Sequence, residues 1–207
     1  MRLILVRHGQ TQWNSVSRVQ GRTDIPLNEK GRLQAEAIAK RLESRAFDAV
    51  YASPLSRARE TAEAITKRCG GTVVLEEDLI EIQFGKWEGM TSAELDRAYP
   101  ELFKDWGWIE RPEDCLRMEA ESQHEIVTRS LRFMRQIETR HGSNAQILVV
   151  GHTMPTKIII AHFIGLPYNR IRSLRIENCA YNELETGHEE RGFLHVLNDT
   201  SHLRGLI

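Results

Sequence analysis

The sequence predicts an α/β fold in which helices flank a mostly parallel sheet. Short apolar runs, such as Leu3–Val6 and Gln146–Val150, alternate along the chain with longer segments of helical pattern. Continuous apolar runs are typical of strands buried on both faces, and their alternation with helices is typical of a parallel sheet covered by helices. The chain has 207 residues and no repeat or Pro/Ser-rich linker, so we expect a single domain over residues 1–207.

The first predicted elements are a strand and a long helix. The strand covers Leu3–Val6, and helical composition extends over Leu27–Arg45, where Asn28 can cap the first turn. Apolar residues at helical spacing predict the buried stripe of this helix. Its expected members are Leu33, Ala37, Ile38 and Leu42.

The middle of the chain predicts two more strands and two more helices. Asp48–Ala52 is expected to be a strand that ends at a new helix, with Ser53 as the N-cap and Pro54 at the first helical position. A third strand is expected over Thr72–Leu75. The segment Thr91–Glu94 has the pattern of a capping box and predicts the start of a short helix.

The last third predicts a long helix, a buried strand, a further helix and two final strands. The long helix is expected over Glu121–Arg140, and the strand over Gln146–Val150. A helix from about Pro155 to Ile164 follows, and strands are expected near Ala180–Glu185 and Phe193–Leu197. The residues expected to be buried on the long helix are Ile126, Leu131, Met134 and Ile137.

Charge and cysteine usage exclude several classes of function. The formal net charge is −1, whereas a nucleic-acid-binding protein normally carries a basic excess. Cys69, Cys115 and Cys179 form no CxxC pair, which argues against a disulfide framework or a cysteine-built zinc site and favours a reducing compartment. Leu3–Val6 is too short for the core of a signal peptide, and no apolar run could span a bilayer. We therefore expect a cytoplasmic protein.

Polar residues follow the ends of the predicted strands. In open α/β sheets, the ligand crevice lies beyond the carboxyl ends of the strands. Four segments are expected to meet there: Arg7–Gly9, Ser53–Arg57, the stretch around Glu81, and Gly151–His152.

Two arginines and two histidines in these segments predict an anion site with a nucleophile. A neutral imidazole is a good nucleophile near neutral pH, which suits His8, and Gly9 lets the backbone approach an oxyanion. The guanidinium groups of Arg7 and Arg57 match phosphate oxygens two at a time, so the residue types favour phosphate. Taken singly, Arg57 could be a solvated helix arginine, and His152 a structural histidine.

The order of these motifs resembles the histidine phosphatase superfamily, also called the phosphoglycerate mutase-like family. The similarity extends over nearly the whole chain. The matching segments are Leu5–Thr11, Trp13–Asn14, Gln20–Arg22, Asp24–Leu27, Ser53–Ala58, Thr61–Ala62, Glu81 with Gly85–Gly89, Glu121–Ser122, Val149–His152, Leu197–Asp199 and His202–Leu203.

The resemblance implies the fold and a role for each matching residue. It implies a three-layer α/β/α sandwich with a mostly parallel central sheet. His8 would be the nucleophile that becomes phosphohistidine, and Glu81 would be the general acid and then the base. The phosphoryl oxygens would be bound by Arg7, Arg57 and His152, with Asn14, Gln20 and Gly21 lining the same pocket. The resemblance implies no metal and no cofactor.

Two departures from the family pattern concern the substrate. The family commonly has Ser-His-Gly at the second histidine, whereas this chain has Gly151-His152-Thr153, so the contribution of these neighbours to substrate binding is open. The segment Glu81–Gly89 is similar to the phosphatase branch, and a substrate-specificity cap is expected over residues 85–117. Aromatic and apolar residues there predict either an apolar mouth or plain core packing. They are Phe84, Trp87, Met90, Trp106 and Trp108.

Several functions share this chemistry. The leading hypothesis is a metal-independent phosphatase acting on a small phosphorylated metabolite. The alternatives are a phosphoglycerate mutase-type phosphotransferase, a phosphoprotein phosphatase and a catalytically silent phosphate-binding protein. A mutase needs a pocket that holds a second anion, and no basic cluster in the cap region, Lys86–Arg117, supplies one. The sequence leaves the oligomeric state open, a homodimer being one arrangement.

Overall fold

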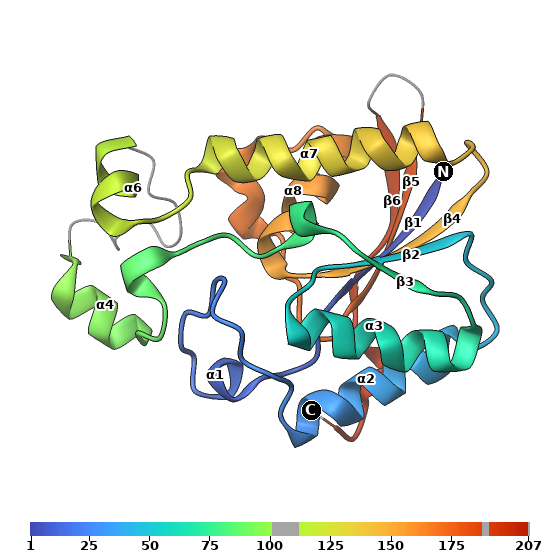
Figure 1. The fold of residues 1–207 in the computed structure, drawn as a ribbon, viewed down its shortest axis with the longest axis horizontal. Helices are drawn as coiled ribbons and strands as arrows, with labels where there is room; N and C mark the ends of the chain where they lie inside the picture. Colours follow the sequence, from blue (N-terminus) through green and yellow to red (C-terminus); the bar gives the residue numbers. More distant parts are fainter. Residues whose placement is uncertain (101–111, 188–190, 207) are drawn as a thin grey trace.

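A six-stranded sheet forms the central layer of the molecule in the computed structural model, which describes residues 1–100, 112–187 and 191–206 (Figure 1). The strand order is β3-β2-β4-β1-β5-β6. The first four strands in this order run parallel, whereas β5 is antiparallel to β1 and to β6. The strands are β1 (Arg2–Arg7), β2 (Ala49–Ala52), β3 (Val73–Leu75), β4 (Gln146–Gly151), β5 (Tyr181–Thr186) and β6 (Gly192–Asp199).

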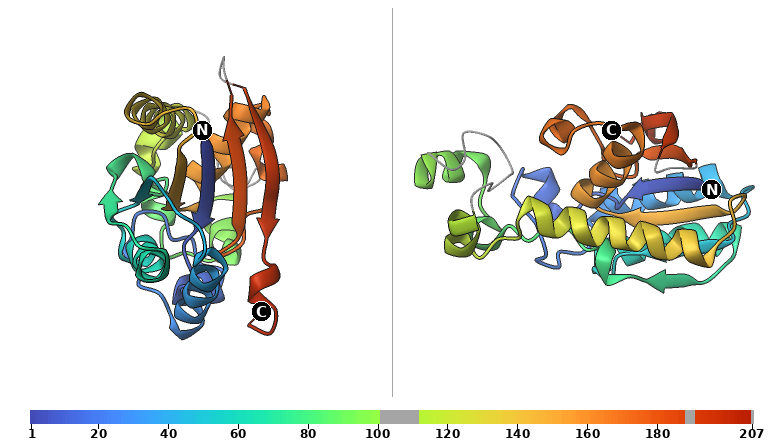
Figure 2. Two further views of the ribbon diagram at one scale, coloured as in Figure 1. Left: turned by 90° about the vertical axis from the view of Figure 1, so that its right-hand side faces the viewer. Right: turned by 90° about the horizontal axis from the view of Figure 1, so that it is seen from above.

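Helices cover both faces of this sheet, as the sequence predicts. Figure 1 shows α7 along one side of the sheet and α2 with α3 along the other, while α4 and α6 lie at one end. Figure 2 shows from a second direction that α4 and α6 lie at one end of the molecule. The helices are α1 (Gln12–Ser15), α2 (Glu29–Leu42), α3 (Ser56–Cys69), α4 (Ser92–Ala98), α6 (Pro112–Met118), α7 (Gln123–Arg140) and α8 (Thr153–Ile164). Short 3₁₀ turns are η1 (Glu77–Leu79), η2 (Gly85–Trp87), η3 (Tyr168–Ser173) and η4 (Ser201–Leu203).

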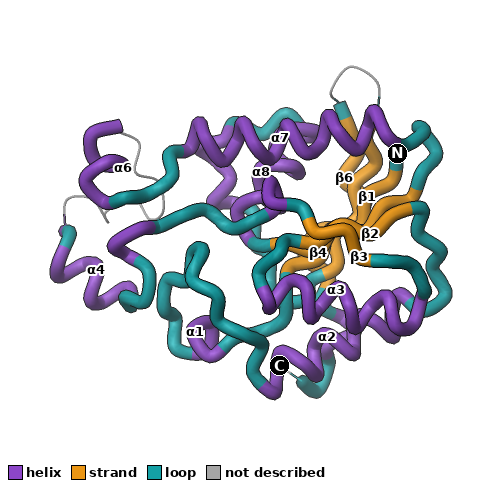
Figure 3. Tube along the Cα trace, in the orientation of Figure 1, coloured by secondary structure: helices purple, strands orange, loops and turns teal. Residues whose placement is uncertain are grey.

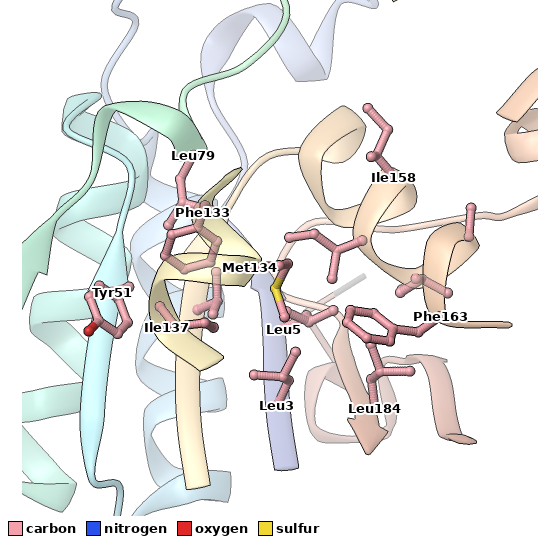
Figure 4. Close-up of a cluster of buried hydrophobic side chains, with 14 of the residues drawn as sticks. Leu3, Leu5, Tyr51, Leu79, Phe133, Met134, Ile137, Ile158, Phe163 and Leu184 are labelled. Carbon is pink, nitrogen blue, oxygen red and sulfur yellow. The ribbon is translucent and has the colours of Figure 1, made fainter. Parts of the chain in front are cut away.

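Alternate residues of each central strand face opposite cores. In β1, Ile4 and Val6 pack with α2 and α3, whereas Leu3 and Leu5 pack with α7 and α8. Figure 4 shows the second of these cores, with Phe133 of α7 beside residues of the sheet. Because successive side chains of a strand point to opposite faces, a continuous apolar run is what a sheet covered on both faces requires. The predicted three-layer α/β/α architecture is confirmed.

The buried stripes of two helices differ from the predicted ones. On α2, Leu33 is 50% exposed, and the buried residues are Gly31, Gln34, Ala35, Ile38, Ala39 and Leu42. On α7, Leu131 is only partly buried, whereas Phe133 is fully buried with the predicted Ile126, Met134 and Ile137. Both errors have one cause. Each misplaced leucine lies five residues from a correctly placed isoleucine. Since a helical turn takes 3.6 residues, a residue five positions away points to a different side of the helix.

The predicted start of the helix after β2 is wrong. Helix α3 begins at Ser56 after an N-cap at Leu55 that makes no side-chain cap, so Ser53 and Pro54 precede it. The hydroxyl of Ser53 instead accepts a bond from the N–H of Leu55 at 3.3 Å and contacts His152. In contrast, the caps predicted at Asn28 and Thr91 are confirmed by side-chain bonds to the N–H groups of Gly31 and Glu94.

The segment predicted to form a cap contains a small buried cluster of its own. Trp87, Leu95, Cys115 and Met118 are buried together at the end of the molecule formed by α4 and α6. The predicted Trp106 and Trp108 lie outside the described residues. Among the residues that the structure describes, no helix combines the length and apolar character that a membrane span needs.

One buried and one exposed residue of α2 provide a matched test of this packing. Ile38 is fully buried, so Ile38→Ala is expected to lower the free energy of unfolding by about 2–5 kcal/mol. Leu33 is half exposed, so Leu33→Ala should change it by about 0.5 kcal/mol or less. Denaturant unfolding of the two variants measures the difference. Equal losses would contradict the orientation of α2 described above.

Candidate active site

A cavity of about 570 Å³ lies beyond the carboxyl end of β1. Loops that leave the strands, drawn in teal in Figure 3, connect this region to α1 and to the cap. All but one of the predicted site residues line the cavity: Arg7, His8, Asn14, Gln20, Gly21, Arg57 and Glu81. His152 is fully buried and does not line it, but its ring lies 5.1 Å from that of His8, measured between ring centroids. The structure therefore brings the four predicted segments together.

His8 is held in the tautomer that a nucleophile needs. Its Nδ1 lies 2.7 Å from the backbone oxygen of Gly9, and a carbonyl oxygen can only accept, so Nδ1 carries the proton. The lone pair of the neutral ring is therefore on Nε2. Burial, together with the positive charges of Arg57 and Arg7, holds the pKa of His8 well below its usual value. His8 is consequently neutral near pH 7, with a nucleophilic nitrogen.

His152 is oriented by a hydroxyl group. Its Nε2 lies 2.8 Å from Oγ of Ser53. That oxygen also accepts the N–H of Leu55, so Ser53 links the ring to the chain that follows β2. Among the described residues Nδ1 of His152 is buried without a hydrogen-bond partner. A buried polar atom of this kind is costly unless a ligand satisfies it.

The two arginines are fixed by neutral oxygens. Arg7 donates from Nη1 to the backbone oxygen of Ile176 at 2.8 Å, while its Nε is buried and lacks a partner among the described residues. Arg57, 1% exposed, donates to the backbone oxygens of Gly21 at 2.7 Å and Thr23 at 2.9 Å. Burial lowers the pKa of Arg57 to about 10, so the group keeps its charge near neutral pH. The carboxylate of Asp24 lies 3.9 Å from Nη1 of Arg57, and the charge of Glu81 acts on both arginines.

Gln20 and Asn14 fill the sides of the cavity. With the amide oxygen of Gln20 directed at Arg57, as a donor-only guanidinium requires, it accepts from Nη1 at 2.9 Å and Nε at 3.0 Å, and the amide nitrogen donates to Thr11. Asn14 accepts through Oδ1 from the N–H of Thr11 at 3.1 Å and from Nδ2 of Asn178 at 3.3 Å. These bonds fix both predicted residues.

Glu88 organises the turn that carries Gly21. Its carboxylate accepts from the N–H groups of Arg22 and Phe84, both at 3.1 Å, and from the N–H of Thr23 at 2.8 Å, and it also bonds the Thr23 hydroxyl. Gly21 has φ +53, and a Cβ at this position would lie 2.1 Å from Oε1 of Glu88. Only glycine fits this turn without displacing the carboxylate.

Glu81 is bound by the first turn of α8. Its Oε1 accepts from the N–H groups of Ile82 at 2.9 Å and Met154 at 3.2 Å, and Oε2 accepts from the N–H of Thr153 at 3.0 Å. Burial raises the pKa of Glu81, although these bonds and the charge of Arg57 oppose the increase. Oε2 accepts only one of these bonds and so has room for a proton. The backbone of Thr153, the residue that departs from the family pattern, thus holds the predicted acid.

A buried arginine fixes the chain that leads to Glu81. Arg129 donates to the backbone oxygens of Asp78, Ile80 and Glu81 at 2.8, 2.6 and 3.1 Å. Both oxygens of Glu121 accept from the same guanidinium, at 2.7 and 3.0 Å. A bidentate pair of this type restricts both partners to one geometry. Glu121 and Arg129 therefore position Glu81 without touching the cavity.

The helix N-termini near the cavity are already occupied. The N–H of Ser56, which begins α3, donates to Oδ1 of Asp24 at 2.9 Å, and the first N–H groups of α8 hold Glu81. Positive charge at the site comes from side chains instead.

Two supporting residues were not predicted to act at the site, whereas the apolar residues of the predicted mouth were. Ser53 orients His152, and Asn178 donates to the backbone oxygen of His8 at 2.9 Å. Phe84 and Trp87 line the cavity, as an apolar mouth requires, whereas Met90 packs on the cap core. Within the described ranges, no group of three or more His, Cys, Asp or Glu side chains could hold a metal ion.

Comparison with known proteins identifies the family. The sequence matches the profile of the Histidine phosphatase superfamily (branch 1) over residues 3–200. It is 34% identical over 203 residues to "Phosphoserine phosphatase 1" of Hydrogenobacter thermophilus, covering 98% of this chain and 94% of that protein. It is 33% identical over 214 residues to "Probable phosphoglycerate mutase GpmB" of Erwinia tasmaniensis, covering 98% and 95%.

Solved structures agree with this assignment. The structure titled Bacillus stearothermophilus YhfR superposes with a TM-score of 0.86 at 32% identity, over 98% of both chains. A mycobacterial glucosyl-3-phosphoglycerate phosphatase in complex with VO3 superposes with a TM-score of 0.85 at 30% identity, over 96% of this chain and 99% of that one. The profile, the sequence relatives and the fold agree, and the chain belongs to the histidine phosphatase superfamily.

Proposed function

We propose that this protein is a metal-independent phosphatase that hydrolyses small phosphate monoesters through a phosphohistidine on His8. One observation carries the proposal. The neutral His8 leaves Nε2 free, and two buried nitrogen atoms without partners among the described residues, Nε of Arg7 and Nδ1 of His152, belong to the groups around it. A phosphoryl group on Nε2 would supply an oxygen for Nε of Arg7 and, with the ring proton of His152 on Nδ1, for that atom as well. Relatives named as phosphoserine and glucosyl-3-phosphoglycerate phosphatases support the same activity.

In the first step, Nε2 of His8 attacks phosphorus. The new P–N bond forms as the bond between phosphorus and the alkoxy oxygen breaks. Arg7, Arg57 and His152 bind the three remaining phosphoryl oxygens, where charge accumulates. The protonated carboxyl of Glu81 gives its proton to the leaving oxygen, which departs as an alcohol.

In the second step, water attacks the phosphohistidine. The carboxylate of Glu81, now ionised, takes a proton from this water as the new P–O bond forms and the P–N bond breaks. The products are inorganic phosphate and neutral His8, with Glu81 protonated again. The arginines supply the positive charge that a divalent metal would otherwise bring.

The cap over residues 85–117 is proposed to choose the substrate. Trp87 joins the buried core of the cap and also lines the cavity, so it links the two. Relatives named as probable phosphoglycerate mutases favour a second candidate, in which the phosphoryl group returns to a bound acceptor instead of water. Measuring inorganic phosphate and isomerised ester in one reaction separates the two candidates. A cytoplasmic location and a homodimer stay predictions.

Chelation and vanadate test the proposed source of positive charge. Because arginine and histidine side chains supply the charge, activity on p-nitrophenyl phosphate is expected to survive excess EDTA. Orthovanadate, which resembles a phosphoryl group in transfer, is expected to inhibit. Steady-state assays measure both effects. Loss of activity on chelation, restored by Mg²⁺ or Zn²⁺, would contradict the mechanism.

Replacing the acid tests its role through the leaving group. An alkoxide is a poor leaving group and needs a proton, whereas p-nitrophenolate does not. Glu81→Gln is therefore expected to slow phosphorylation of His8 by glycerol phosphate by about 10²–10⁴-fold. The loss with p-nitrophenyl phosphate should be far smaller. The pre-steady-state burst is measured, because later hydrolysis of phosphohistidine also uses Glu81. Glu77→Gln, on the exposed surface of η1, is the control.

The pH dependence of the glycerol phosphate burst completes this test. Burial disfavours both charged forms, which lowers the pKa of His8 and raises that of Glu81. Phosphorylation should fall at acid pH as His8 protonates and at alkaline pH as Glu81 ionises. Glu81→Gln should lack the alkaline limb. Equal slowing of both bursts, or an unchanged alkaline limb, would exclude Glu81 as the acid and make Glu177, the other carboxylate that lines the cavity, the next candidate.

A further inference from the structure

One peptide group in the loop after β1 is bonded on both of its edges. It joins Gly9 to Gln10. Its oxygen, which belongs to Gly9, lies 2.7 Å from Nδ1 of His8 and keeps the ring proton there. Its N–H, which belongs to Gln10, donates to Oε1 of Gln34 at 2.9 Å. The oxygen and the N–H of a trans peptide lie on opposite edges of one rigid plane. Gln34 therefore holds the plane that presents an acceptor to His8.

Gln34 reaches this peptide group from helix α2. It is 5% exposed, does not line the cavity, and lies one helical turn after Gly31. At that turn the helix approaches the loop so closely that a Cβ on Gly9 would lie 2.4 Å from the backbone oxygen of Gly31. The close approach requires glycine, and glycine leaves the backbone free to rotate at this point. A bond from outside the loop is needed to fix the plane.

The two neighbouring peptide groups are held by other residues. On one side, the N–H of Gly9 donates to Oγ1 of Thr61 at 3.1 Å. On the other side, the oxygen of Gln10 accepts from the N–H of Asn28 at 3.0 Å. With both neighbours fixed, the middle plane can turn only by itself. Its oxygen would then leave His8 as its N–H leaves its own acceptor, so the two bonds are coupled.

We propose that Gln34 is a positioning residue that sets the tautomer of His8 through the peptide group between Gly9 and Gln10. The inference rests on the proposed function, in which His8 is the nucleophile, and adds a residue outside the cavity. Which ring nitrogen of a neutral histidine carries the proton depends on the bond that the other nitrogen makes. In water the proton favours Nε2, which removes the lone pair that attacks phosphorus. Gln34 keeps that lone pair available.

NMR of the substrate-free protein tests the proposal directly. With isotope-labelled histidine, the ring nitrogen signals that are absent from His8→Ala belong to His8. In wild type they should show a proton on Nδ1 and none on Nε2. Gln34→Leu keeps a side chain of similar size and removes the acceptor, so it should shift the ring toward the tautomer protonated at Nε2. Gln34→Glu keeps an acceptor oxygen and should retain the wild-type signals.

The pre-steady-state burst shows what this shift does to the reaction. Gln34→Leu is expected to slow phosphorylation by about 10-fold or more, because fewer rings carry the lone pair on a fixed Nε2. The loss should be equal for glycerol phosphate and p-nitrophenyl phosphate, since the nucleophile attacks both, and Gln34→Glu should recover most of the rate. Ile38→Val is the matched control. It removes buried volume from the same helix without touching the loop, and should keep the tautomer and both bursts.

The outcomes separate this inference from the proposed function. An unchanged ring in Gln34→Leu, as a purely structural role would give, overturns the inference and leaves the phosphatase activity standing. A loss confined to glycerol phosphate also overturns it, because the effect would then act through the acid. If Gln34→Leu does not fold, a proton on Nε2 in wild type or in Gln34→Glu overturns it. If wild type hydrolyses neither ester, the proposed function fails, while the spectra still decide whether Gln34 sets the tautomer.

Discussion

The central constraint of this structure is that the hydrogen bonds of two guanidinium groups, one buried and one half-buried, go chiefly to backbone oxygens. Arg57 is fixed by the backbone oxygens of Gly21 and Thr23, and Arg7 by that of Ile176. Carboxylates in direct contact would have neutralised these groups, whereas the ion pair of Arg57 with Asp24 is long, at 3.9 Å. Burying a charge in this way is costly unless a ligand completes the pairing. The fold therefore holds two guanidinium groups in fixed positions where a bound anion can pair with them.

The same burial sets the protonation of the reacting groups in opposite directions. It holds His8 neutral, so that the nitrogen is nucleophilic, and it raises the pKa of Glu81 toward the protonated form that an acid requires. Each group is then fixed by backbone bonds: His8 by the oxygen of Gly9, and Glu81 by the first turn of α8 and by the segment that Arg129 holds. Position and protonation thus arise from one buried environment at the ends of the strands.

The sequence predicts the sheet and the meeting of the site segments because both depend on local patterns. Buried strands read as apolar runs, and polar residues follow their ends. It cannot predict which group satisfies a helix end, since that depends on distant residues: Ser53 serves His152 and not the helix after it, and Glu81 occupies the start of α8. Gln34 shows the same limit, because helical pattern alone does not reveal that its side chain bonds to the loop after β1. The motifs are local in the sequence, whereas the residues that bond to them come from distant parts of the chain.

The most direct test is to identify the phosphorylated atom. Wild type quenched during turnover of p-nitrophenyl phosphate should carry a base-stable, acid-labile phosphate that peptide mapping assigns to His8. Phosphorus NMR of the denatured protein should place it on Nε2, because Nδ1 is engaged by the backbone oxygen of Gly9. His8→Ala should carry no label. Phosphate on His152 or on Nδ1, or turnover without any covalent intermediate, would contradict the assignment of His8 as the nucleophile.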